Sequence, residues 1–478
     1  MSREARNATL SVVTNREAKL SRRSFLKSAL AAGGAALLAN PLLGADSGKP
    51  SLPKLKGNRF ITFNTVVRVN QIEVSRDRNA GEDEGNLHTL AAVRRLRDCF
   101  ERGFPGGRMT WAFSWLALQD QRPNYQDVRK QVVEYHHNYG DEITFIPGGY
   151  FAPMYNSRKQ VNRDLHDALK LVLEVVGKGY RPHSVVAGYL AAENLRYLAE
   201  HEGIHVAQGN IWSQYAVDNG DGDGSPSYPY YPSRQHFCKP AQSQADLIDC
   251  VNLDGWTMDF LAARRQGFAG GFNSRMGVGP IETVFAHGQE KGLRQMVETT
   301  AVHFDTGFSL NGFAWVTDCW EVCLVPKAID SLTLWLQEIR RRWPATLCVT
   351  QGEFGLAWRR QYQTNDRVDY RFVQRGTGIG GSDVDKEIRW FMNRDFRLAL
   401  LRDWKNNGPE QVIDLTRYDL PAQEPPDASP DKPSRNWSLM NRINQKGTRP
   451  QDKPVLLAEL PTEDRDLIRR RYPELLKH

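Results

Sequence analysis

The sequence predicts an α/β fold in which a (β/α) barrel of seven or eight units precedes a small β-rich domain. Strand-like and helix-like segments alternate along residues 59–360, as they do in parallel α/β sheets and barrels. The predicted barrel domain, residues 46–360, also has a plausible length for one such barrel. Beyond Gln361 the segments become shorter, and several alternate apolar and polar residues with a period of two. Residues 361–478 are therefore expected to form a β-rich accessory domain.

The individual elements follow from the spacing of apolar residues and from turn signals. Helices are expected at Leu87–Arg102, Val128–Tyr139, Leu165–Lys178, Ala192–Glu202, Gly288–Ala301 and Lys327–Arg342. Barrel strands are expected at Arg59–Asn64, Met109–Leu116, Glu142–Pro147, Ser184–Tyr189 (strand or turn), Ile204–Gly209, Ile248–Leu253, Gly312–Val316 and Thr346–Thr350. The second domain is expected to contain the strands Val368–Gln374, Glu387–Met392, Phe396–Trp404 and Gln411–Tyr418, the surface loop Pro421–Pro433 and a final helix, Glu463–Leu476.

Residues 1–45 are typical of a twin-arginine signal peptide. The segment Ser21–Lys27, SRRSFLK, matches the twin-arginine pattern, and a weakly hydrophobic run, Ser28–Leu43, follows it. That run is too short and too rich in alanine and glycine for a stable membrane span. We therefore expect the twin-arginine export machinery as a partner, and a periplasmic or secreted protein that begins after about residue 45.

The charge distribution argues against a nucleic acid as partner. Of the formal charge of +7, residues 1–45 contribute +5 from seven basic and two acidic residues, which leaves about +2 for the remainder. No cluster of lysine and arginine with interleaved aromatic residues stands out. The 12 tryptophans and 16 tyrosines often stand beside glycine, asparagine or aspartate, which suits the binding of sugar rings, although tryptophan more often packs in a core. A carbohydrate is therefore the expected substrate.

Two patterns of possible structural chemistry are weak. Six cysteines in so long a chain do not indicate a disulfide framework, although Cys238 could pair with Cys250, and Cys319 with Cys323 or Cys348. Residues 219–224 resemble the first half of a calcium loop, but its twelfth position is Tyr230 where a glutamate is expected. We therefore predict no cofactor, with structural calcium near Asp221 and Asp223 as the alternative.

The order of segments from Arg59 to Gln208 resembles the polysaccharide deacetylase (NodB-type) barrel. The segments that carry this resemblance are Thr62-Phe63-Asn64, Thr110–Phe113, Gly140–Ile143, and Tyr180-Arg181-Pro182 with the helix after it. The metal ligands of that family are missing, because Asn64 stands where an aspartate is expected and Thr144–Phe151 contains no histidine.

Over most of its length the chain also resembles a family of uncharacterised secreted bacterial proteins. These proteins are provisionally described as glycoside hydrolases, and they combine a deacetylase-like barrel with a second, β-rich domain. The segments Gly209–Tyr215 and Gly352–Gly355 carry this resemblance. It implies a barrel of the glycoside hydrolase/deacetylase type and supplies no catalytic residue.

Candidate catalytic residues are carboxylates that follow predicted strands. Glycoside hydrolysis usually needs two carboxylates, and in barrels such groups stand at the C-terminal ends of strands. Glu353 follows a predicted strand, within a GEFG motif that resembles the nucleophile strand of cellulase-like barrels; a buried structural carboxylate is the alternative. Asp254 also follows a strand and precedes Trp256, a possible sugar platform. Asp318 and Glu321 are the third and fourth candidates.

These observations predict an exported carbohydrate-active enzyme, a glycoside hydrolase that uses Glu353 and Asp254 as its carboxylate pair. A non-catalytic carbohydrate-binding protein on the same barrel is the alternative, and a polysaccharide deacetylase is the third possibility. The predicted substrate-binding residues are Trp256, Trp212, Asn64 and Trp358. No metal is expected.

Overall fold

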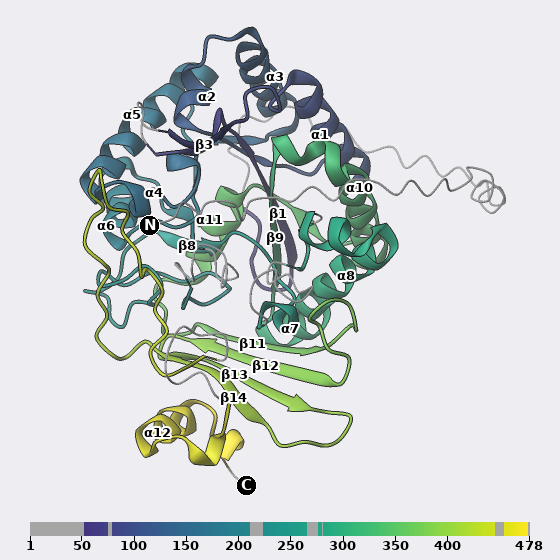
Figure 1. Ribbon diagram of the computed structural model, residues 1–478, viewed down its shortest axis with the longest axis vertical. Helices are drawn as coiled ribbons and strands as arrows, with labels where there is room; N and C mark the ends of the chain where they lie inside the picture. The colour runs from purple at the N-terminus through teal and green to yellow at the C-terminus, as the bar shows by residue number, and fades with distance from the viewer. Residues whose placement is uncertain are drawn as a thin grey trace, which may run out of the picture. The chain divides into compact units, whose positions relative to one another are not determined.

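The strand β1 (Arg59–Val67) lies at the centre of the larger of two parallel sheets (Figure 1). It pairs along one edge with β9 (Ala314–Glu321), and along the other edge with β10 (Leu347–Cys348) and then β4 (Thr110–Phe113). The strand β5 (Glu142–Phe145) extends the sheet beyond β4. All these pairings are parallel, and eight of the nine residues of β1 are buried. A strand buried on both faces is typical of a parallel sheet covered by helices.

A second parallel sheet consists of β6 (Val185–Val186), β7 (Val206–Asn210) and β8 (Val251–Asp254). The segment after β8 returns to the first sheet, where the backbone N–H of Thr257 donates to the carbonyl of Thr317 at 2.9 Å. We call the eight strands β1 and β4–β10 the parallel core. Each of them overlaps a strand expected from the sequence, so the predicted α/β class is confirmed.

The computed structural model describes residues 52–74, 79–210, 223–264, 276–279, 281–444 and 454–476, which belong to one unit, Leu52–His478. Among these residues no helix combines the length and the apolar character that crossing a membrane requires. All six cysteines are described, and each is free and buried. The possible cysteine pairs are therefore not formed.

Helices separate the strands of the parallel core, as the sequence predicts. The longer ones are α1 (Leu90–Gly103), α3 (Pro123–Tyr139), α5 (Arg158–Val176), α8 (Gln289–Ala301) and α10 (Val325–Arg342), and the shorter ones are α2 (Trp115–Gln119), α4 (Ala152–Tyr155), α6 (Ala192–Tyr197), α7 (Phe260–Ala263) and α9 (Phe308–Asn311). In α1, the Thr89 side chain accepts a hydrogen bond from the Ala92 N–H and caps the first turn. The same helix buries Val93, Leu96 and Phe100, which recur at helical spacing and pack on the sheet.

The helix α11 (Gln351–Gln361) was not expected, and it lies at the N-terminal ends of the core strands. Its first backbone N–H groups donate to the Thr110 hydroxyl and the Glu142 carboxylate, which belong to the first residues of β4 and β5. A side chain at Gly355 would collide with Val206, the first residue of β7. The helix therefore closes this end of the parallel core.

The remaining chain forms an antiparallel sheet of β11 (Asp369–Arg375), β12 (Lys386–Asn393), β13 (Phe396–Asp403) and β14 (Gln411–Arg417), with β15 (Ile443–Asn444) and β16 (Val455–Leu456) at its edge. The predicted β-rich second part is confirmed. The predicted final helix is two shorter pieces, α12 (Thr462–Arg471) and a 3₁₀ turn at Pro473–Leu476. Leu467, Ile468 and Tyr472 pack against one face of the sheet.

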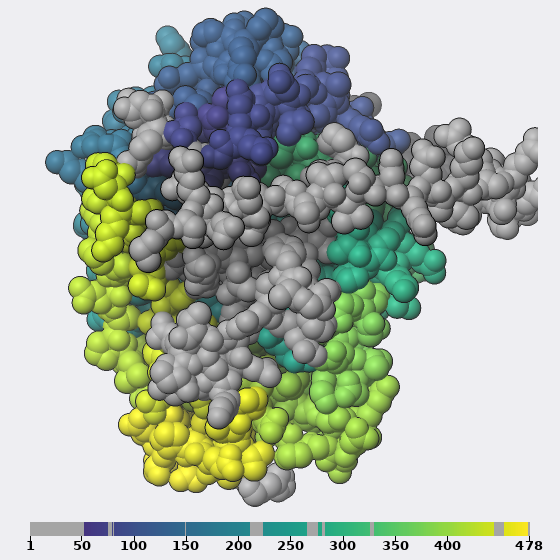
Figure 2. Space-filling model, in the orientation of Figure 1, coloured from purple at the N-terminus to yellow at the C-terminus, as the bar shows by residue number. Residues whose placement is uncertain are grey.

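The proline-rich segment 421–433 links the second part of the chain to the helices of the parallel core (Figure 2). Its Glu424 carboxylate accepts hydrogen bonds from the backbone N–H groups of Ala192 and Phe237, and it pairs with Arg158 at 3.1 Å. The predicted surface loop is thus anchored at a buried carboxylate.

A short hairpin, β2 (Asn70–Glu73) and β3 (Asn79–Asp83), follows β1 and was not predicted. Its return strand delivers Glu84 beside the end of β1, where the Glu84 N–H donates to the Val69 carbonyl at 2.7 Å. The hairpin therefore places an acidic side chain at the C-terminal end of the parallel core.

Candidate active site

Arg68 organises the C-terminal end of the parallel core, because it follows β1 directly and meets two carboxylates. Its guanidinium donates to both carboxylate oxygens of Glu84, at 2.6 and 3.0 Å. It also donates to Glu321, the last residue of β9, at 2.9 Å. The Arg68 side chain is only 5% exposed. One buried guanidinium thus binds two carboxylates that are far apart in the sequence.

The charges in this group are fixed by their surroundings. Burial alone would raise the pKa of Glu84, but hydrogen bonds and charges from His88 and Arg68 lower that pKa to about 2. Burial would lower the pKa of Arg68, yet the charges of Glu321 and Glu84 raise it well above its usual value. Glu84 is therefore ionised and Arg68 charged at neutral pH.

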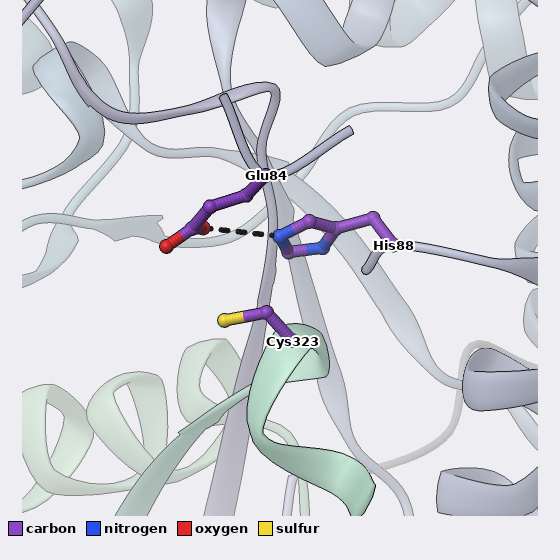
Figure 3. A group of neighbouring side chains, drawn as sticks. All are labelled: Glu84, His88 and Cys323. Carbon is purple, nitrogen blue, oxygen red and sulfur yellow. Dashed lines mark hydrogen bonds and ion pairs between the residues drawn. The ribbon is translucent and has the colours of Figure 1, made fainter. Parts of the chain in front are cut away.

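His88 and Cys323 complete a group of possible metal ligands around Glu84 (Figure 3). The Nε2 atom of His88 lies 3.3 Å from Oε2 of Glu84, and the donor atoms of Glu84, His88 and Cys323 all lie within 4.8 Å of one another. His88 is fully buried and Cys323 is 7% exposed. Burial and the charge of Glu321 raise the pKa of Cys323.

Two aromatic residues, Tyr150 and Trp256, lie beside this group, and we call them the aromatic wall. Tyr150 follows β5 and contacts the Trp256 ring with a centroid separation of 6.4 Å. Its hydroxyl lies 3.4 Å from the Cys319 sulfur, and the Trp256 indole donates to the Cys319 carbonyl at 3.1 Å. Tyr150 and Phe151 have positive φ angles of 112° and 59°. Such backbone costs roughly 1–3 kcal/mol per residue and is concentrated at functional sites.

Asn64 lies deeper in the parallel core, below the aromatic wall. It belongs to the inward-facing residues of β1, as do Thr62, which bonds Thr317, and Val66, which packs with Tyr150 and Cys319. Its side chain is fully buried, and neither amide atom has a hydrogen-bond partner among the described residues. An unsatisfied buried polar group costs about 1–3 kcal/mol, so its retention suggests a role in binding.

Asp254 and Glu321 end the strands β8 and β9, as the sequence predicts for catalytic carboxylates. Asp254 is 2% exposed and accepts a hydrogen bond from the Gly255 N–H. The chain between the two strands carries Trp256, which contacts β9 through Cys319. Trp256 therefore follows one of the two carboxylates along the chain and contacts the strand that ends in the other.

Asp318 faces the other way, which corrects its prediction as a candidate carboxylate. On β9 its side chain points to the face opposite that of Cys319 and Glu321, and it shares a face with Val316 and Trp320. Those two residues pack in the large apolar cluster formed with α1 and α10. Because side chains on a strand point alternately to opposite faces, Asp318 is directed toward the helices.

Glu353 occupies a different position from the one predicted. It lies in the first turn of α11, where it forms a capping box with Thr350 and an ion pair with Arg108 at 2.8 Å. Burial raises the pKa of Glu353, and Arg108 partly offsets this effect. Since α11 contacts the first residues of the core strands, Glu353 and Asp254 lie at opposite ends of the parallel core. The predicted pair does not share one site.

The other predicted binding residues have different outcomes. Trp358 is fully buried in α11, stacks on Tyr362 and donates to the Tyr370 hydroxyl, which leaves no face of the ring for a sugar. Trp212 and Asp221 lie outside the described residues. Asp223 is buried and pairs with Arg397 at 2.9 Å. Because Asp221 lies outside the described residues, calcium near Asp221 and Asp223 stays a prediction.

Arg68, Glu84, His88, Cys323 and Tyr150 were not identified from the sequence. The spacing of Glu84 and His88 just before a helix offered one signal, because a four-residue separation can bring two ligands together. Nothing in the sequence connects them with Cys323, which is more than 200 positions away. Only the pairing of β1 with β9 brings the group together.

Comparison with protein families gives matches over nearly the whole described chain. A model described as a domain of unknown function with a solved structure (DUF3863) matches residues 53–392, and a second domain of unknown function with a solved structure (DUF3864) matches residues 397–475. The twin-arginine translocation pathway signal sequence matches residues 19–39, so the predicted export signal is confirmed. No curated protein matches the chain.

Solved structures provide a close relative. The crystal structure of a protein from Parabacteroides distasonis, provisionally described as a glycoside hydrolase/deacetylase, is 53% identical, with a TM-score of 0.86 over 88% of this chain and 99% of that chain. A provisionally described polysaccharide deacetylase from Mycobacterium smegmatis is 13% identical, with a TM-score of 0.41 over 65% of this chain and 93% of that chain. A GH57-type branching enzyme from Pyrococcus horikoshii is 9% identical, with a TM-score of 0.35 over 62% of this chain and 69% of that chain.

Proposed function

Since the chain belongs to the DUF3863 family and carries a twin-arginine signal, we propose that it is an exported carbohydrate-active enzyme, a glycoside hydrolase. The provisional description of the Parabacteroides distasonis relative supports a sugar substrate. The observation that carries the proposal is the C-terminal end of the parallel core, where Asp254 and Glu321 end β8 and β9 and the Trp256 ring contacts both Tyr150 and the Cys319 carbonyl of β9.

We assign the two carboxylates of the reaction to Asp254 and Glu321, in place of the pair with Glu353. Glycosidases protonate the leaving oxygen with one carboxyl group, while the second acts as nucleophile or base. Glu321 is ion-paired with Arg68, which suits the ionised partner. Asp254 is nearly fully buried, which suits the acid. Asn64 and the rings of Trp256 and Tyr150 are assigned to substrate binding.

The alternative of a non-catalytic sugar-binding protein is favoured by one observation. Arg68 is hydrogen-bonded to both Glu321 and Glu84. A carboxylate that is paired with a guanidinium is a weaker nucleophile. A polysaccharide deacetylase is not supported at the positions of the family's metal ligands, because Asn64 and the segment Thr144–Phe151 offer no aspartate or histidine.

The proposal is tested by incubating the mature protein with a panel of plant, bacterial and host glycans. Release of new reducing ends and binding by calorimetry are measured on the same samples. We expect release from at least one glycan, and loss of release with retained binding in Asp254→Asn, because the amide keeps the shape but cannot donate a proton. Binding without any release across the panel would favour the sugar-binding alternative, and neither activity would refute both.

A further inference from the structure

We infer that Glu84, His88 and Cys323 form a zinc site at the C-terminal end of the parallel core (Figure 3). The three residues supply a carboxylate oxygen, an imidazole nitrogen and a sulfur, and zinc binds all three donor types. This inference rests on the donor group itself and is independent of the proposed hydrolase activity.

The separation of the donor atoms, which is a long hydrogen bond in the metal-free protein, also fits a shared metal. Nε2 of His88 and Oε2 of Glu84 are 3.3 Å apart, slightly beyond the usual range of an N–H···O bond, roughly 2.7–3.2 Å. Two ligands at about 2.0–2.1 Å from one zinc in a tetrahedral arrangement lie about 3.3–3.4 Å apart. The Cys323 sulfur lies within 4.8 Å of both atoms, so a modest side-chain rotation brings it to coordinating distance.

The charge of the group also calls for a cation. Arg68 carries one positive charge, whereas Glu84 and Glu321 carry two negative charges in a largely buried site. The carboxylates therefore outnumber the guanidinium group, which favours a cation at the donor atoms.

Arg68 would act as the outer support of this site. Its guanidinium donates to both carboxylate oxygens of Glu84 and to Glu321. The Glu321 carboxylate lies 3.6 Å from the Cys323 sulfur. Outer partners of this kind orient the ligands of a metal. The three ligands leave a fourth position open, as in catalytic zinc sites.

The sulfur and nitrogen donors distinguish zinc from calcium and magnesium, which bind oxygen ligands. The site differs from the metal positions of the deacetylase family, around Asn64 and Thr144–Phe151. It therefore revises the expectation of no metal, which considered only those positions.

The test measures metal in the full mature protein without any sugar. After removal of metal by a chelator, the protein is dialysed against zinc, and bound zinc is quantified by mass spectrometry. We expect about one zinc per chain. We expect Cys323→Ser and His88→Leu to lose affinity by more than the roughly 10- to 100-fold typical of changes in outer partners. The matched control Cys250→Ser removes another buried thiol and should keep full zinc binding.

Cobalt substitution gives a spectroscopic signal that depends on coordination by Cys323 and would not change if Cys323 had only a structural role. Wild-type protein with cobalt should show a thiolate-to-cobalt absorption band that Cys323→Ser abolishes and Cys250→Ser retains. If a variant fails to fold, anomalous scattering at the zinc edge from wild-type crystals decides, with a peak expected between the three donor atoms. No bound zinc in the wild type, no such peak, or unchanged binding in Cys323→Ser would overturn the inference.

Discussion

The two ends of the parallel core differ in the hydrogen bonding of individual buried polar residues and in backbone strain. At the N-terminal end, the Glu142 carboxylate accepts hydrogen bonds from the backbone N–H groups of His183, Ser184 and Gly352 and from the Ser184 hydroxyl. Toward the C-terminal end, Tyr150 and Phe151 have positive φ angles, and below them the Asn64 amide, in the middle of β1, has no partner among the described residues. A saturated polar network stabilises a fold, whereas unsatisfied groups and strained backbone favour a binding role. We therefore attribute stability to the N-terminal end and function to the C-terminal end.

One residue departs from this contrast. Gln351 lies at the N-terminal end, in the first turn of α11, and its side-chain amide is buried without a partner in the described part of the chain. It provides a control for Asn64, because both amides are buried without a partner in the described part of the chain and only Asn64 lies on the inward face of β1 with Val66, which packs against Tyr150.

The largest expected effect comes from Glu142→Ala at the N-terminal end. Removing the carboxylate leaves several buried donors unsatisfied, which should lower the free energy of unfolding by about 3 kcal/mol or more. Urea denaturation followed by fluorescence measures this loss. Glu174→Ala, an exposed position on α5, should change stability by less than about 0.5 kcal/mol. An equal effect of the two substitutions would remove the proposed role of Glu142.

The pH dependence of stability should report on Glu84 at the C-terminal end. Its pKa is about 2 in the folded protein against 4.5 as the ordinary value, so its contribution is fully present above about pH 4.5 and is lost as the pH falls toward 2. In metal-free protein, the stability difference between wild type and Glu84→Gln should shrink over that range. Unfolding curves at pH 2.5 to 7 measure it, with Glu174→Gln as the control. A difference that grows on acidification would contradict the assigned ion pairs.

The smallest expected change in stability comes from replacing the two unsatisfied amides, Asn64 and Gln351, which should differ in their effect on sugar binding. Asn64→Val removes an unsatisfied buried amide and should raise the free energy of unfolding by about 1 kcal/mol, while sugar binding falls. Gln351→Met should give a similar gain without any loss of binding. Thermal unfolding and calorimetric titration of both variants measure the two quantities. Loss of stability in Asn64→Val would show that its amide has an internal partner.

The sequence predicted the fold well because the core strands are buried apolar runs. β1 and β9 stand out by composition, and α1 by the spacing of its apolar face. The helix α11 was missed because two glycines lower its helix propensity and its start follows a short strand. The capping-box pair Thr350 and Glu353 was the signal for a helix start that could have identified it.

The candidate site was only partly predictable. Asp254, Glu321 and Trp256 follow strands, so sequence position alone places them at the correct end. Asp318 failed because its face depends on where the alternation of β9 begins relative to the helices. The group of Glu84, His88 and Cys323 depends on strand pairing between distant segments, which no local pattern reveals.

Turnover of Glu321→Gln and Glu353→Gln, measured side by side on a glycan that the wild type cleaves, tests most directly whether function belongs to the C-terminal end. Both substitutions replace a carboxylate with an amide of the same shape, one at each end of the parallel core. We predict that Glu321→Gln lowers turnover by about 10²- to 10⁴-fold. Glu353→Gln should retain turnover within about twofold, since this side chain caps α11 at the other end of the core, away from the reacting groups. Loss of turnover in Glu353→Gln with activity retained in Glu321→Gln would contradict the account.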